Sequence, residues 1–198
     1  MARERLGMLG GTFDPPHIGH AIVGQDVLER LGLDRLLLVP AGIPPHREHV
    51  LPADVRLDLV GRMVEDREGL EVSDVEVRRD GPSYTVDTLE ALRGALEPDQ
   101  LVCVIGADQF EVIDTWYEHQ RLPALAELAV MSRDGTVPAA SSQTGSIPYI
   151  TVDVTRVDIS GTRIRRRLRA GRSIRYLVPE SIREAVERAW LEHGREAG

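Results

Sequence analysis

The sequence predicts an α/β fold, with a doubly wound, mostly parallel sheet and helices on both of its faces. Two observations predict it. Short apolar runs with the composition of β-strands recur along the chain, and they alternate with longer stretches whose apolar residues fall at helical spacing. This alternation is typical of parallel strands joined by crossover helices. Ligands of such sheets bind beyond the carboxyl ends of the strands.

The elements are expected in a regular order. The strand-like runs are Leu6–Leu9, Leu36–Val39, Val72–Val77, Leu101–Ile105, Leu128–Met131 and Tyr149–Val152. The helical stretches are Ile18–Arg30, Ala53–Glu65, Thr85–Leu96, Glu111–Glu118, Ser160–Ala170 and Pro179–His193. The last of these opens with a proline, which fits the first turn of a helix. Residues 134–146 have loop composition. We expect one domain over residues 1–198, with a helical portion from about residue 160.

All 24 basic side chains are arginines, and the chain has no lysine. This excludes a P-loop NTPase, which needs a lysine on the β/γ-phosphates. It also excludes pyridoxal-phosphate and aldolase chemistry, which need a lysine amine. Arginine is a planar, permanently charged fork that binds carboxylates and phosphates. Anion binding is therefore expected from arginine, histidine and backbone N–H groups.

The chain of 198 residues is 42% hydrophobic and 28% charged, which is ordinary for a globular domain with one core. Its net charge of −8 disfavours long polyanions such as duplex DNA and leaves a small phosphorylated ligand open. The single Cys103 excludes an intramolecular disulfide. No signal peptide and no membrane-spanning run is recognisable, so we expect a cytoplasmic protein without a membrane partner.

The first strand leads directly into Gly10–His20, which reads Gly-Gly-Thr-Phe-Asp-Pro-Pro-His-Ile-Gly-His, and a helix follows. Glycines allow a close backbone approach, and a helix N-terminus presents N–H groups to an anion, so a phosphate is expected here. His17 and His20 share one helix face, where both can bind one triphosphate. Gly19 would keep that face open. Two other interpretations are a zinc pair assisted by Asp14 and a purely structural glycine turn.

A second candidate segment begins near residue 160. Ser160 is a good N-cap residue, but Arg163 brings a positive charge to the positive end of the same helix. A bound anion would relieve that conflict. From Arg163 to Arg175 there are seven arginines and no acidic residue. A solvated basic face or an RNA-binding patch is the other interpretation of this stretch.

Both of these segments resemble sequence motifs of one enzyme superfamily. Gly10–His20 resembles the signature of the HxGH nucleotidyltransferase superfamily, and here it reads His-Ile-Gly-His at its end. Ile159–Arg165, which reads Ile-Ser-Gly-Thr-Arg-Ile-Arg, resembles the second motif of that superfamily, usually written Ile-Ser-Ser-Thr-x-Ile-Arg. Gly161 stands in place of the second serine, as it does in other members. The resemblance implies a Rossmann-like nucleotidyltransferase fold.

Further segments resemble the bacterial nicotinate-nucleotide adenylyltransferases in order and spacing. They are Pro44–Arg47, Ser83–Thr85, Gly106–Phe110 and Trp116–Tyr117. The first is similar to a Pro-Pro-His-Lys element, with Arg47 in place of the lysine, which keeps the charge but changes its geometry. The resemblance covers the chain from Leu6 to about Leu177.

The resemblance implies a role for each matched residue. Those implied in catalysis are His17, His20, Ser160, Thr162 and Arg163. Those implied in ATP binding are Gly10, Gly11, Thr12, Phe13, Asp14, Gly19, Gly106, Asp108 and Ile159. Those implied in binding the mononucleotide are His46, Arg47, Thr85, Trp116 and Tyr117. In the alternative interpretations, Trp116 is a core residue, Tyr84 only packs, and Asp108 is an N-cap.

The implied reaction joins nicotinate mononucleotide to ATP and yields deamido-NAD and pyrophosphate, a step of NAD biosynthesis. Mg²⁺ is expected to arrive on the ATP phosphates, and neither a protein metal ligand nor a nucleic-acid partner is expected. The alternatives are an adenylyltransferase that prefers nicotinamide mononucleotide or phosphopantetheine, and a non-catalytic nucleotide- or RNA-binding module.

Overall fold

The computed structural model describes residues 4–45, 51–132 and 147–194. Its six strands form one parallel sheet in the order β3-β2-β1-β4-β5-β6. The strands are β1 (Arg5–Gly11), β2 (Arg35–Pro40), β3 (Leu70–Val72), β4 (Gln100–Gly106), β5 (Glu127–Ser132) and β6 (Ile150–Asp153). The winding direction reverses between β1 and β4, as in the predicted doubly wound fold.

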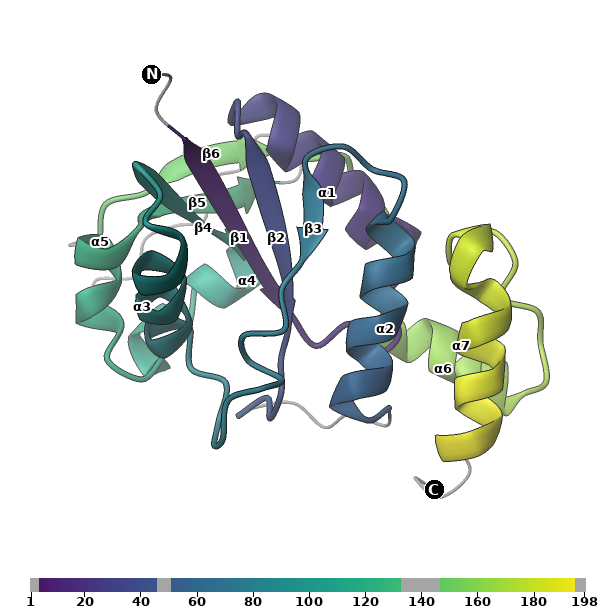
Figure 1. The fold of residues 1–198 in the computed structure, drawn as a ribbon. Helices are drawn as coiled ribbons and strands as arrows, with labels where there is room; N and C mark the ends of the chain where they lie inside the picture. The colour runs from purple at the N-terminus through teal and green to yellow at the C-terminus, as the bar shows by residue number, and fades with distance from the viewer. Residues whose placement is uncertain (1–3, 46–50, 133–146, 195–198) are drawn as a thin grey trace.

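Helices cover both faces of the sheet (Figure 1). One face carries α1 (Ile18–Arg30), α2 (Ala53–Val64), α6 (Gly161–Arg169) and α7 (Glu180–His193), and the other carries α3 (Thr85–Leu96) and α5 (Leu122–Leu125). Along β2, Leu36 and Leu38 enter the first core, while Leu37 and Val39 enter the second. Burial on both faces explains why the strands read as continuous apolar runs.

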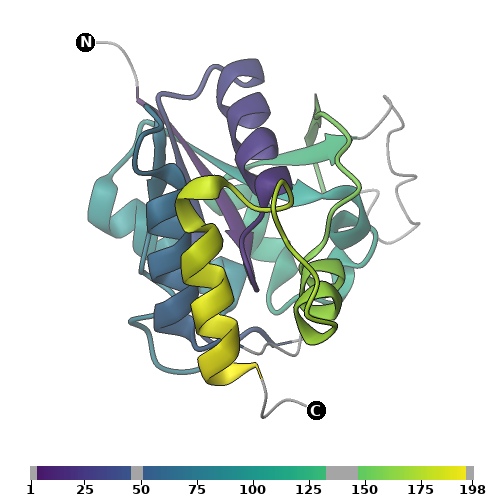
Figure 2. The same cartoon turned by 90° about the vertical axis from the view of Figure 1, so that its right-hand side faces the viewer.

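The two C-terminal helices complete the first of these cores. Ile164 of α6 and Ile182 and Val186 of α7 are buried in it. Figure 2 shows α7 lying along α2, and the two helices are in contact. The helical end of the chain is therefore attached to the same layer as α1 and α2.

The predicted strand at Val72–Val77 is mostly wrong, because β3 ends at Val72. The residues beyond Val72 are not a strand. Val75 packs against the core beneath α3, and Glu76 is buried with its Oε1 accepting a hydrogen bond of 2.7 Å from the Thr88 hydroxyl. These adjacent side chains both face inward, so burial here does not follow the alternation that the sequence pattern predicted.

The predicted helix at Glu111–Glu118 is also wrong. The structure has a short α4 (Ala107–Phe110) and the single 3₁₀ turns η1 (Ile113–Thr115) and η2 (His119–Arg121). Trp116 is extended at φ −76° and ψ 142°, and Glu118 has a left-handed φ of 48°. Both conformations interrupt a helix. The predicted loop at 134–146 lies outside the described residues.

Candidate active site

The predicted motifs meet at the carboxyl edge of the sheet. β1 ends at Gly11 and β4 ends at Gly106, on either side of the point where the winding direction reverses. β2 ends beside β1, with Pro40 paired to Gly11. Adjacent parallel strands whose connections leave in opposite directions open a crevice at this edge. Gly10 is exposed there, so a ligand can reach the backbone of β1.

His17 and His20 lie together at the N-terminus of α1. Their rings are stacked, with centroids 3.7 Å apart and planes 18° from parallel. The backbone N–H of His17 donates to Nδ1 of His20 at 3.1 Å. Because Nδ1 accepts that hydrogen bond, the neutral His20 ring carries its proton on Nε2. Nε2 of His20 is therefore a hydrogen-bond donor.

Burial keeps both imidazoles neutral at neutral pH. It lowers the pKa of His17 to about 4. It also lowers the pKa of His20 well below its ordinary value, with charge repulsion from His17 as a second cause. Nδ1 of His17 is buried and makes no hydrogen bond in the described part of the chain. A buried ring nitrogen without a partner is rare in a purely structural histidine.

Phe13 shapes the loop between β1 and α1. Its φ of +51° is uncommon for a bulky residue. Its buried ring meets the His20 ring edge-on, with centroids 4.7 Å apart. A Cβ on Gly11 would lie 2.9 Å from the Phe13 ring, and a Cβ on Gly19 would lie 3.1 Å from Nδ1 of His17. Gly11 and Gly19 therefore leave room for the Phe13 and His17 rings.

Asp14 joins the first motif to the second. Its carbonyl oxygen accepts a hydrogen bond of 2.5 Å from Nη1 of Arg165, and its carboxylate lies 3.6 Å from the same nitrogen. Its Oδ1 accepts a hydrogen bond of 3.2 Å from the Leu51 N–H. A Cβ on Gly161 would lie 2.5 Å from the Asp14 carbonyl oxygen, so the two backbones are in close contact. The Asp14 carboxylate thus faces protein groups.

The second motif forms the start of α6. Ser160 caps the helix as predicted, with its Oγ accepting a hydrogen bond of 3.2 Å from the Arg163 N–H. The exposed Arg163 side chain donates to the Asp158 carbonyl oxygen at 2.9 Å. Thr162 is exposed, and Ile159 packs against the core. The motif presents a helix N-terminus, a hydroxyl and a guanidinium beside the first motif.

Ser83 fixes the start of α3 to the loop that follows β2. Its Oγ accepts hydrogen bonds from the N–H groups of Gly42 at 2.9 Å and Ile43 at 3.3 Å. Its own N–H donates to the Ile43 carbonyl oxygen at 2.9 Å. Thr85 is the first residue of α3, where backbone N–H groups have no partner within the helix. Thr85 therefore stands at a positive helix end beside this loop.

Trp116 and Tyr117 lie near the start of α3. Trp116 is partly buried and packs against the core beneath that helix, as its core interpretation expects. The Tyr84 ring stacks on Tyr117, with centroids 4.5 Å apart, so Tyr84 is a packing residue. Asp108 is exposed, and the N-cap of α4 is Gly106. The N-cap interpretation of Asp108 is therefore wrong.

Arg56 of α2 is a candidate that the motifs do not contain. Its side chain is fully buried at the carboxyl edge of the sheet. Nη1 donates to the Thr12 carbonyl oxygen at 2.8 Å, Nη2 to that of Gly42 at 3.2 Å, and Nε to that of Leu51 at 3.0 Å. Burial lowers the pKa of the guanidinium, and nearby carboxylates, Asp14 first among them, oppose that change.

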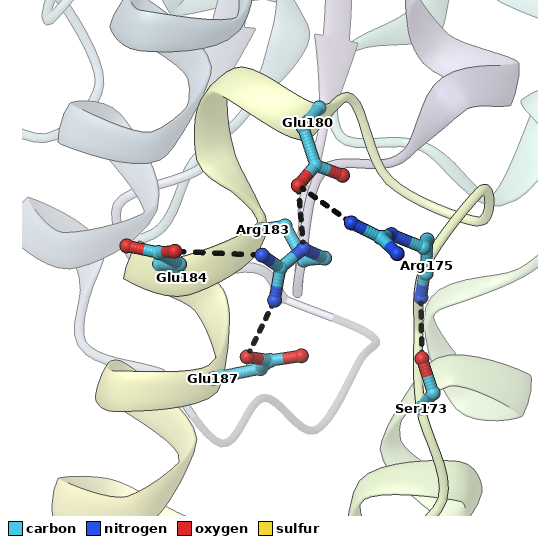
Figure 3. Close-up of polar contacts among 6 residues, drawn as sticks. All are labelled: Ser173, Arg175, Glu180, Arg183, Glu184 and Glu187. Carbon is cyan, nitrogen blue, oxygen red and sulfur yellow. Dashed lines mark hydrogen bonds and ion pairs between the residues drawn. The ribbon is translucent and has the colours of Figure 1, made fainter.

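The basic stripe between 163 and 175 makes several contacts inside the protein. Nε of Arg167 donates to the Ser173 carbonyl oxygen at 2.8 Å. Figure 3 shows Arg175 directed at Glu180 of α7, with nitrogen and oxygen 3.8 Å apart. In the same view Arg183 bridges Glu180 to two further glutamates of that helix. These contacts favour a structural role for Arg167 and Arg175 of the stripe.

The remaining predictions concern His46, Arg47, metals and membranes. His46 and Arg47 lie outside the described residues. Among residues 4–45, 51–132 and 147–194, no three His, Cys, Asp or Glu side chains gather into a group that could hold a metal ion. No helix in these ranges is long and apolar enough to cross a membrane.

Known proteins resemble this chain over most of its length. A sequence model of the cytidylyltransferase-like family matches residues 8–167. Two similar proteins are named "Probable nicotinate-nucleotide adenylyltransferase". That of Thermus thermophilus is 40% identical over 94% of this chain and 98% of its own length. That of Chromohalobacter salexigens is 42% identical over 96% of this chain and 94% of its own length. The solved Plasmodium falciparum nicotinic acid mononucleotide adenylyltransferase complexed with NaAD shares the fold, with a TM-score of 0.74 at 14% identity (96% and 95%).

Proposed function

Because this chain belongs to the nicotinate-nucleotide adenylyltransferases of the cytidylyltransferase-like family, we propose that it transfers the AMP moiety of ATP to nicotinate mononucleotide. A phosphate oxygen of the mononucleotide forms a bond to the α-phosphorus of ATP. The bond from that phosphorus to the oxygen bridging to the β-phosphate breaks. Pyrophosphate leaves with that oxygen, and the product is deamido-NAD.

The attacking phosphate is already anionic at neutral pH, so the reaction needs no general base. Catalysis then consists of aligning the nucleophile with the α-phosphorus and stabilising the charge that builds on the phosphates and the leaving group. Preformed hydrogen-bond donors at fixed positions supply both effects. The structure supports this requirement, because its candidate residues are donors held on helix ends rather than acid–base pairs.

The observation that supports the proposal most is the contact between the two motifs. The Arg165 bond to Asp14 and the close approach of Gly161 hold the N-termini of α1 and α6 beside one another. Both helix ends are positive, and both bear donors, Nε2 of His20 and the Arg163 guanidinium. We assign the triphosphate to this pair of helix ends.

The catalytic donors at these ends are His17, His20, Ser160, Thr162 and Arg163. The buried histidines are neutral before ATP arrives, and His20 already donates through Nε2 in that form. Negative charge beside His17 raises the pKa of its ring toward the protonated form, so a polyphosphate strengthens this donor. Thr12, Gly10, Gly11 and Ile159 offer backbone groups to ATP, and exposed Asp108 beyond Gly106 offers a carboxylate to its ribose.

The mononucleotide lies at the other side of the crevice. The Thr85 N–H and hydroxyl at the start of α3 bind the nicotinate carboxylate, together with the Tyr117 backbone N–H. Trp116 offers its ring face to the cationic pyridinium. We assign the mononucleotide phosphate to His46 and Arg47, which lie outside the described residues, because they match the family's phosphate-binding element in the sequence.

A divalent cation fits this site as part of the substrate. Mg²⁺ is commonly held by substrate phosphates with one or two carboxylates or none. The Asp14 carboxylate already faces Leu51 and Arg165, which leaves it poorly placed for a cation. We therefore assign Mg²⁺ to the ATP phosphates, where it supplies positive charge to the leaving pyrophosphate.

The proposal is tested by giving the purified protein ATP, Mg²⁺ and either nicotinate or nicotinamide mononucleotide, and measuring pyrophosphate. We expect turnover with the nicotinate form. His20→Ala should reduce kcat by roughly 100-fold or more in a protein that remains folded, because it removes a charge-stabilising donor. His193→Ala, at the end of α7, is the matched control and should retain normal kcat. Absence of turnover with either mononucleotide would contradict the proposal.

A further inference from the structure

Arg56 connects the two loops to which the proposed function assigns the two substrates. One of its carbonyl partners, Thr12, lies in the loop after β1 that approaches ATP. Another, Gly42, lies in the loop after β2 that leads to the mononucleotide contacts. The third, Leu51, precedes α2 itself. A single side chain thus fixes three backbone segments at the carboxyl edge of the sheet.

The guanidinium of Arg56 is suited to holding these loops at a fixed separation. Arg56 is in the first turns of α2, at the positive helix end, where a buried cation is unfavourable. Its donors are directed at backbone carbonyl oxygens, and no carboxylate of the described residues pairs with it at ion-pair distance. A planar guanidinium donates in fixed directions, so it sets the relative positions of its acceptors. An ammonium group carries its three donors on one freely rotating nitrogen, so it does not fix acceptors at the spacing that separate guanidinium nitrogens set.

The contacts of Arg56 continue on both sides toward the proposed substrate residues. Leu51, whose carbonyl oxygen accepts from Arg56, donates its N–H to Asp14 of the first motif. Gly42 donates its N–H to the Ser83 hydroxyl at the start of α3. A Cβ on Gly42 would lie 2.3 Å from the Glu76 carbonyl oxygen, so this loop is also closely packed from its other side.

We propose that Arg56 is a positioning residue for AMP transfer. It holds the loop after β1 and the loop after β2 at the separation at which the mononucleotide phosphate is in line with the α-phosphorus. Arg56 is fully buried and touches neither substrate. This inference rests on the proposed function. Each loop keeps its own binding groups without Arg56, so its loss affects alignment more than the binding of either substrate.

The test compares Arg56→Met and Arg56→Lys with the unaltered protein in steady-state assays that vary each substrate. A small misplacement of reacting groups lowers the rate by roughly 100-fold. We therefore expect Arg56→Met to lower kcat by about that factor, with KM for ATP and for the mononucleotide each within about threefold of normal. Arg56→Lys keeps the charge and should recover only part of kcat. Calorimetric titration of ATP alone should give a nearly normal Kd.

The matched control is Arg62→Met, a change of the same kind on the exposed face of α2, where Arg62 pairs with Asp58 at 2.8 Å. It should leave kcat and both KM values unchanged. Normal kcat in a folded Arg56→Met protein would overturn the inference, and so would a raised KM with normal kcat. Failure of both variants to fold would also overturn it, by making Arg56 a stability residue. Turnover by the unaltered protein tests the proposed function separately.

Discussion

At the scale of single residues, the burial of His17 makes the stability of the protein depend on pH. Its folded pKa is about 4, below the ordinary value of 6.5, because burial penalises the charged ring. The unfolded chain therefore binds a proton more readily than the folded chain in this interval. Stability is lost as the pH falls from 6.5 toward 4, by about 3 kcal/mol in total.

We predict that His17 lowers the free energy of unfolding in urea by about 2 kcal/mol between pH 7 and about pH 5, and that His20, whose pKa is also lowered, adds to this loss. Burial raises the pKa of Glu76, which opposes this loss as the pH falls, so comparison with a His17 variant isolates the histidine part. His17→Asn should reduce the loss clearly, since asparagine does not titrate. His193→Asn is the control and should lose as much stability as the unaltered chain. An equal loss in His17→Asn would show that the His17 ring is not held neutral by burial.

Arg56 is a site residue that belongs to none of the recognised motifs. Arginine is usually a surface residue, and nothing in the local sequence marks it as a clamp. A signal is nevertheless present, because Arg56, Leu59, Val60 and Met63 follow the helical spacing of the buried face of α2. That spacing predicts burial. It cannot predict the three carbonyl partners, which come from loops up to 44 residues away along the chain.

At the scale of elements, the docking of α6 on the loop after β1 depends on Gly161. In the sequence alone, Gly161 is simply a position of the second motif at which the usual serine, with its hydroxyl, is missing. In the structure a Cβ there would lie 2.5 Å from the Asp14 carbonyl oxygen, which is too close without movement. The glycine is therefore explained by contact between two distant segments.

We predict that Gly161→Ala moves α6 away from the first motif. The free energy of unfolding should fall by about 1–3 kcal/mol, and kcat should fall by about tenfold or more, because Arg163 moves with the helix. Gly94→Ala is the control, since a Cβ at this α3 position has no neighbour within 4 Å. It should raise stability by about 0.5–1 kcal/mol and leave kcat unchanged. Normal kcat in Gly161→Ala would contradict the docking account.

The sequence predicted the elements that carry local signals. Ile18–Arg30 and Thr85–Leu96 agree with α1 and α3 at both ends. The errors at Val72–Val77 and Glu111–Glu118 fall where tertiary contacts override periodicity. In the first, Glu76 is buried against Thr88 although strand alternation would place it outside, and in the second, the positive φ of Glu118 breaks a helical pattern.

At the scale of the whole molecule, the charge distribution agrees with a small anionic substrate. The chain has a net charge of −8, yet seven of its 24 arginines lie between Arg163 and Arg175, without an acidic residue among them. Part of this positive charge is balanced within the fold by the α7 glutamates around Arg175 and Arg183 (Figure 3). Arg163 remains exposed at a helix N-terminus beside the histidine pair. One exposed guanidinium and two positive helix N-termini thus lie where the triphosphate is proposed to bind.

The location of the candidate site was predictable from the sequence, because motif residues follow successive strands and strand ends share one edge. Its internal structure was not. The stacking of the two histidines, the turning of Asp14 toward Arg165 and the clamp of Arg56 all depend on contacts between segments far apart in sequence. Periodicity and motif spacing carry no information about such contacts.

The central claim is that this chain makes deamido-NAD from ATP and nicotinate mononucleotide. The most direct test incubates the protein with ATP, Mg²⁺ and equal concentrations of nicotinate and nicotinamide mononucleotide, and identifies the dinucleotides by mass spectrometry. We predict that deamido-NAD is the main product, because Thr85 at the start of α3 favours a carboxylate over an amide. NAD as the main product, or no dinucleotide at all, would contradict the account.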